Sequence, residues 1–189
     1  MQKRVLSVLI TVCLIFGIVH MVLAEGKEPY QKAKQTVLGK YVTAKEAYEK
    51  WKANPETVNI IDVRTVGEYV YVGHTPMALN IPFMLYKWDP VQGKMLKTEN
   101  PKFDALIKKR YKAKDTILIM CRSGNRGAAA VNRLASVGYK NVYTITDGFE
   151  GDKIKDKHSY FKDKRMRNGW KNSGAPWTYE LNPEMVYRD

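Results

Sequence analysis

The segment of residues 116–127 constrains this chain more than any other. An apolar run, TILIM, leads into a cysteine and a short polar loop, CRSGNR, and an alanine-rich stretch of helical character follows. A buried strand, a tight loop and a helix in this order place Cys121 at the carboxyl end of a strand, where open α/β sheets bind their ligands. We therefore expect Cys121 to lie on a solvent-facing loop and to be chemically functional.

Three features of this loop favour the thiolate form of Cys121. Backbone N–H groups can point at the sulfur, the following helix presents its positive end, and Arg122 and Arg126 add charge. A free cysteine has a pKa near ~8.5, and surroundings of this kind lower it to roughly 3.5–7.5. The alternative for a lone cysteine, a buried inert residue, is disfavoured by the polar flanks. Cys121 is the candidate nucleophile.

The other loop residues have distinct expected roles. Arg122 is expected at the mouth of the pocket, where a guanidinium holds an anion by paired hydrogen bonds. Arg126 is expected to brace the loop, although either arginine could be an ordinary surface residue. Ser123, Gly124 and Asn125 are expected to contribute mainly backbone, since Gly and Asn tolerate left-handed conformations.

The spacing of this loop separates two enzyme classes. Cys121 and Arg126 follow the pattern C-x4-R, whereas cysteine phosphatases use C-x5-R, one residue longer. The loop resembles the active-site loop of rhodanese-like sulfurtransferases. A second segment resembles the first conserved block of that family, with IIDVR at 60–64, EY at 68–69 and GHTPMALNIP at 73–82. Two motifs in the right order are more specific than one.

Three positions depart from the family pattern. Thr75 and Met77 stand where an aliphatic residue and a glycine are usual, and Gly127 stands where Ser or Thr is common. None of them is the nucleophile. The departures therefore bear on local turn geometry and leave the implied activity intact.

The resemblance implies an α/β domain with a central, mostly parallel sheet flanked by helices. It also implies sulfur transfer through a persulfide on Cys121, without a cofactor. The donor would be a small anion such as thiosulfate or polysulfide, and the acceptor a thiol, cyanide or an acidic redox protein. Two alternatives stay open: a binding module that presents sulfur with little turnover, and a cysteine phosphatase or arsenate reductase, which the short loop disfavours.

Four further polar residues are candidates for supporting the site. Asp62, Arg64 and Glu68 follow a buried strand, and we expect a structural ion pair and a helix cap in preference to electrostatic support of the loop. His74 is expected to be a turn histidine. The chain has three histidines and no Cys/His spacing typical of zinc or haem, so no metal is expected.

Periodicity predicts alternating strands and helices, as in layered α/β domains. Strands are expected at 41–42, 57–64, 79–83, 116–120 and 141–146. Helices are expected after a capping box at Thr43 and Glu46, at 103–111, and at 126–137 before Gly138. Residues 84–100 have no clear period and are expected to be a loop or an insertion.

The ends of the chain suggest export. Residues 1–24 have a charged start, an apolar stretch and a small-residue cleavage site after Ala24, as in a secretory signal peptide. An uncleaved membrane anchor is the alternative. Cleavage would leave a periplasmic or secreted protein without stable membrane insertion. We expect a leader at 25–40, a domain at 41–177 with a basic insertion at 152–171, and a tail at 178–189.

The net charge of +13 at pH 7 suits several anionic partners. No nucleic-acid recognition motif accompanies it, and export argues against nucleic acid. A solvated basic surface is the simplest interpretation, with small anions or an acidic protein as partners.

Overall fold

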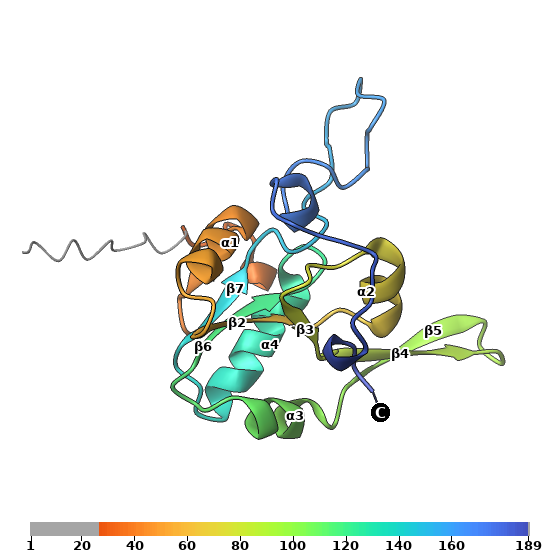
Figure 1. The fold of residues 1–189 in the computed structure, drawn as a ribbon. Coiled ribbons are helices and arrows are strands. Elements are labelled where there is room, and N and C mark those ends of the chain that lie inside the picture. Colours follow the sequence, from red (N-terminus) through yellow and green to blue (C-terminus); the bar gives the residue numbers. More distant parts are fainter. Residues whose placement is uncertain (1–26, 189) are drawn as a thin grey trace, which may run out of the picture.

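A five-stranded parallel sheet forms the centre of the domain in the computed structural model, which describes residues 27–188 (Figure 1). The strand order is β1-β7-β6-β2-β3, and every pairing is parallel. The strands are β1 (Tyr41–Val42), β2 (Val58–Asp62), β3 (Ala78–Asn80), β6 (Thr116–Met120) and β7 (Val142–Ile145). The predicted α/β fold with a parallel sheet is confirmed. The expected signal segment lies outside the described residues.

Four α-helices flank the sheet: α1 (Ala44–Ala53), α2 (Val66–Val72), α3 (Phe103–Arg110) and α4 (Asn125–Ser136). Helix α1 begins at the predicted capping box, in which Thr43 and Glu46 cap each other. A second box, formed by Thr65 and Glu68, begins α2. Helix α4 ends just before Gly138, whose φ of 99° suits glycine.

Each face of the sheet has its own apolar core. Helices α3 and α4 cover one face, where Phe103, Ile107 and Leu134 are buried against strand residues. Helix α1 and a C-terminal segment cover the other, where Trp170 is fully buried. Figure 1 shows these layers on opposite sides of the strands. Because both faces of the sheet are covered, the position of the carboxyl end of β6 is fixed, and Cys121 directly follows that end.

Residues 84–100 were expected to be a loop, and the structure shows instead an antiparallel hairpin. Its strands are β4 (Met84–Asp89) and β5 (Lys94–Glu99), which project from the layered body (Figure 1). Every residue of β5 is exposed. A strand without a buried face has no alternation of polar and apolar residues, so the periodicity that predicts strands is missing here.

Both ends of the described chain pack on the domain. A 3-10 turn at Lys32–Lys34 precedes β1, and the buried Lys34 forms an ion pair with Asp152 at 3.1 Å. The expected leader is thus attached to the domain. Near the other end, Thr178 pairs with His74 in an antiparallel bridge, and a short 3-10 turn spans Pro183–Met185. Within residues 27–188, no helix combines the length and apolar character needed to cross a membrane.

Candidate active site

Cys121 follows β6 directly and begins a loop that ends where α4 starts. The backbone N–H of Gly124 donates a hydrogen bond to Cys121 Sγ at 3.1 Å. Gly124 has a φ of 103°, and a Cβ at this position would lie 2.3 Å from the carbonyl oxygen of Thr146. Only glycine fits such a position. The loop therefore curls around the sulfur, with a backbone donor directed at it.

Cys121 is buried, contrary to the expectation of a solvent-facing residue. Only 1% of its surface is exposed. Gly127 explains part of this burial, since a Cβ there would lie 3.7 Å from Cys121 Sγ and 3.1 Å from Thr144 Oγ1. Glycine lets the first turn of α4 approach the sulfur closely. The space that Ser or Thr would need at position 127 is limited by the hydroxyl of Thr144, which has no hydrogen-bond partner among the described residues.

A turn after β7 supports the loop from behind. The N–H of Phe149 donates to the carbonyl of Cys121 at 2.7 Å, and the N–H of Glu150 donates to that of Arg122 at 2.9 Å. Gly148, with a φ of 62°, has its backbone against the loop, and a Cβ there would lie 2.4 Å from the Cys121 carbonyl oxygen. The sequence motifs did not predict a role for this turn. Gly148, a glycine shortly after the last strand, was the one sequence feature that could have indicated a close backbone contact here.

Glu68 and Arg126 meet beside the loop, although the sequence analysis treated them separately. The guanidinium of Arg126 donates to both carboxylate oxygens of Glu68, and the two side chains are only 17% and 19% exposed. Burial raises the pKa of Glu68, but hydrogen bonds and charge from Arg126, with hydrogen bonds from Thr65, outweigh it and lower this pKa to about 2. Burial lowers the pKa of Arg126, yet Glu68 outweighs that effect and raises it above its ordinary value.

Asp62 and Arg64 form a fully buried ion pair behind the site. Arg64 Nη2 donates to Asp62 Oδ2 at 2.6 Å and to the Gly73 carbonyl at 2.8 Å. Its guanidinium carbon lies 4.1 Å from the centre of the Phe149 ring. Because Phe149 also binds the Cys121 carbonyl, this pair supports the loop through one intervening residue.

His74 lies away from the sulfur. Its ring stacks on that of Tyr69 with centroids 4.0 Å apart, and its two nitrogens face the carbonyls of Tyr69 and Glu180. His74 thus joins α2 to the C-terminal segment.

The outer side of the loop is open. Arg122 and Asn125 are exposed, Ser123 is half-buried, and the Arg122 side chain has no hydrogen bond or ion pair within residues 27–188. The same residues contain no group of three or more His, Cys, Asp or Glu that could hold a metal ion. The arrangement provides a nucleophilic sulfur, a backbone donor beside it and a free cation at its rim.

Comparison with known proteins finds similarity to rhodanese-like domain proteins. A sequence model of the family described as "Rhodanese-like domain" matches residues 43–155. An uncharacterized protein from Rickettsia rickettsii, the RP600 homolog, is 30% identical over 138 residues, covering 73% of this chain and 96% of its own length. The chloroplastic rhodanese-like domain-containing protein 9 of Arabidopsis thaliana is 27% identical over 131 residues, covering 60% of this chain and 55% of that protein.

A solved structure agrees with these relatives. The crystal structure of Rv0390 from M. tuberculosis aligns with a TM-score of 0.57 and 27% identity, covering 74% of this chain and 97% of that one. The range that the family model matches, 43–155, includes strands β2, β3, β6 and β7, the cysteine loop and the turn after β7. The chain therefore belongs to the rhodanese-like domain family, which includes sulfurtransferases.

Proposed function

We propose that this protein is a sulfurtransferase that carries sulfur as a persulfide on Cys121. The hydrogen bond from the Gly124 N–H to Cys121 Sγ carries this proposal, because a preorganised backbone donor stabilises negative charge on sulfur. The loop from Cys121 to Arg126 is also one residue shorter than the C-x5-R loop of cysteine phosphatases, which favours a sulfur atom over a phosphoryl group.

The reaction has two steps, each a displacement at sulfur. The Cys121 thiolate attacks the outer sulfur of thiosulfate, the bond between the two sulfurs of the donor breaks, and sulfite leaves with the electron pair. Cys121 then holds a persulfide anion. A second nucleophile, such as cyanide or a thiolate, attacks the outer sulfur, and the Cys121 thiolate is released. Charge and sulfur balance in both steps, and no metal or cofactor takes part.

The two loop arginines divide the work. Arg122 is exposed at the rim and has no side-chain partner among residues 27–188, so its guanidinium is available to hold an anionic donor by charge-assisted hydrogen bonds. Arg126 is occupied by Glu68, so it positions the start of α4 and does not bind the donor.

The burial of Cys121 restricts the substrate. With 1% of the residue exposed, a donor must present a slender sulfur to the thiol. Thiosulfate and inorganic polysulfide end in a single sulfur atom, whereas an aryl disulfide brings two rings to the reacting bond. We infer small anionic sulfane donors as the substrate class, with a thiol, cyanide or an acidic redox protein as acceptor.

The mass of the protein after exposure to thiosulfate tests the mechanism. The wild-type protein should gain one sulfur atom, and cyanide should remove it with formation of thiocyanate. Cys121→Ser should gain nothing and show no thiosulfate:cyanide activity while retaining a cooperative melting transition. Activity at the wild-type level in Cys121→Ser would refute the proposal. A persulfide that forms but is not turned over would favour the sulfur-presenting binding module.

A further inference from the structure

A cavity of about 270 Å³ lies beside the loop and is lined mainly by cations. Its walls come from the N-terminal 3-10 turn, from Ser123 and Asn125 at the start of α4, and from the basic insertion. The lining includes five cationic side chains and one acidic one, namely Lys34, Lys153, Lys155, Arg165, Arg167 and Asp152. Such a concave, single-signed lining concentrates positive potential.

The single acid in the cavity is already engaged. Asp152 Oδ1 accepts a hydrogen bond from Lys34 Nζ at 3.1 Å, and Asp152 Oδ2 accepts one from Asn168 Nδ2 at 3.1 Å. The Lys34 side chain is 8% exposed. Asp152 therefore balances the buried lysine, and the lining keeps an excess of positive charge from the remaining cations.

Two of these cations have no partner. The side chains of Lys155 and Arg167 form no hydrogen bond or ion pair with any residue in 27–188. Arg165 Nη1 donates to the Gly151 carbonyl at 2.6 Å, a neutral acceptor, and its charge also contributes to lowering the pKa of Asp152. The Lys153 and Asp163 side chains are 3.9 Å apart and well exposed, which makes their pairing weak. The rim of the cavity thus presents free donors.

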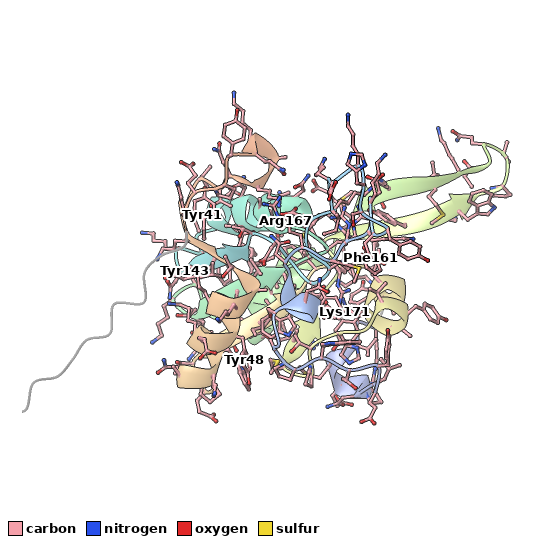
Figure 2. All side chains as sticks on the ribbon, turned by 90° about the horizontal axis from the view of Figure 1, so that it is seen from above. Tyr41, Tyr48, Tyr143, Phe161, Arg167 and Lys171 are labelled. Atoms are coloured by element: carbon pink, nitrogen blue, oxygen red, sulfur yellow. The ribbon has the colours of Figure 1, made fainter. Side chains whose placement is uncertain are left out.

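The base of the insertion is held in place, which anchors the backbone that carries the cations of this rim. The N–H of Asp152 donates to Asn168 Oδ1 at 2.7 Å, and the N–H of Gly169 donates to Asp147 Oδ2 at 2.9 Å. Arg167 comes directly before Asn168 in this base, and Figure 2 shows Arg167 and Phe161 of the same insertion at separate positions over the molecule. An anchored backbone reduces the entropy lost when these side chains bind an anion.

We propose that this cavity is a second anion site, separate from the sulfur, for a compact oxyanion of the sulfate, sulfite or phosphate type. Its volume lies just below the roughly 300–1,000 Å³ of pockets for drug-sized ligands, so a small ligand fits it best. The N-terminal end of α4, a helix of 12 residues, adds positive potential at its wall. Arginine and lysine are the side chains that bind such oxyanions.

The oxyanion can come from either of two sources, and the experiment that distinguishes them rests on the proposed sulfur transfer. It is either the free sulfite that leaves after the first step or the anionic group of a donor approaching Cys121. Binding itself does not depend on turnover. The site can therefore be tested in a protein without the catalytic thiol, so its failure is distinguishable from failure of the proposed function.

Calorimetric titration with sodium sulfate at low ionic strength tests the site, in the Cys121→Ser background. We expect saturable binding of one sulfate, weakened about tenfold or more by the double change Lys155→Ala and Arg167→Ala. The control is Lys108→Ala with Lys109→Ala, which removes equal charge from the exposed end of α3. The control should bind sulfate as before. Absence of saturable binding, or equal weakening in both double variants, would overturn the proposal.

Steady-state kinetics with the intact thiol then assigns the source. If the donor's oxyanion occupies the cavity, sulfate competes with thiosulfate, and the double variant raises KM with little change in kcat. If free sulfite occupies it, the double variant leaves KM unchanged and reduces product inhibition by sulfite. Either result supports the site. Unchanged kinetics and unchanged sulfite inhibition would overturn its role in sulfur transfer.

Discussion

Arg126 Nη1 and Nη2 donate to the two carboxylate oxygens of Glu68 at 2.7 and 2.5 Å, across 58 positions of sequence. Glu68 also caps α2 through Thr65, so one carboxylate holds the start of α2 and the start of α4 together. The pair connects the two motifs that resemble the family. It also makes the geometry of the loop sensitive to a single charge.

The pH dependence of stability should reveal this charge. The pKa of Glu68 falls from 4.5 to about 2 on folding, so its contribution is complete above pH 4.5 and is lost as the pH falls toward 2. The shift corresponds to on the order of 3 kcal/mol. Glu68→Gln retains capping ability and should remove that stability at pH 7. Chemical denaturation measures the free energy of unfolding of each variant. The control is Glu46→Gln, which alters the equivalent capping box of α1, where no arginine pairs with the glutamate, and should change that free energy little.

Loss of Arg122 should affect donors unequally. Arg122→Ala should cost roughly 1.5–3 kcal/mol with thiosulfate, about ten- to a hundredfold in kcat/KM. The loss should appear mainly in binding and should be much smaller for sulfur delivered by a docked protein. Arg126→Ala should slow transfer from every donor, because it disturbs the loop itself. Equal losses with all donors in both variants would contradict this division.

Gly148→Ala should abolish sulfur transfer. Alanine at a φ of 62° costs about 1 kcal/mol or more, and its Cβ would press on the Cys121 carbonyl. Gly39→Ala is a matched control, because Gly39 has the same φ of 62° and nothing within 4 Å of its Cβ position. The thermal melt of Gly39→Ala measures the cost of the left-handed φ alone, and Gly148→Ala should lose more stability because its Cβ also meets backbone atoms of the loop. Only Gly148→Ala should lose activity, and retained activity there would show that the loop tolerates displacement.

The buried thiol should discriminate between reagents by size. A slender thiosulfonate should modify native Cys121 much faster than a bulky aryl disulfide, whereas denatured protein should react readily with both. Mass spectrometry of timed samples measures the two rates. Equal rates in the native state would mean that the sulfur is more accessible than its 1% exposure indicates.

Export should produce a protein beginning at Glu25. N-terminal sequencing of protein from the exported fraction tests cleavage after Ala24. Recovery of the intact N-terminus in a membrane fraction would establish the anchor instead.

The sequence was sufficient for those parts of the fold with a regular buried pattern. The strand before Cys121 is an apolar run and the strand before Arg64 is nearly one, and the parallel sheet follows from them. The strand expected at 79–83 ends earlier, at Asn80, and Pro82 in that stretch has no N–H for a ladder. The hairpin at 84–100 has no buried face and left no periodic signal.

The site was predictable as a set of residue types but not as a set of contacts. The cysteine, the loop glycine and the two arginines follow from the motif. Three contacts join residues that are far apart in the sequence: Arg126 with Glu68, Phe149 with Cys121, and Lys34 with Asp152. A local sequence pattern contains no information about such contacts. The burial of Cys121 likewise depends on Gly127 and Thr144, which meet only in the folded sheet.

The short strand β1 places the N-terminal segment directly beneath the site. The N–H of Thr146 donates to the Val42 carbonyl at 2.9 Å, and the Thr146 carbonyl lies against Gly124. Seven residues separate Ala24 from the packed turn that begins at Lys32, and fully extended they span at most about 25 Å. If the apolar segment stays in a membrane, this short tether would confine sulfur transfer to a thin layer above the lipid surface.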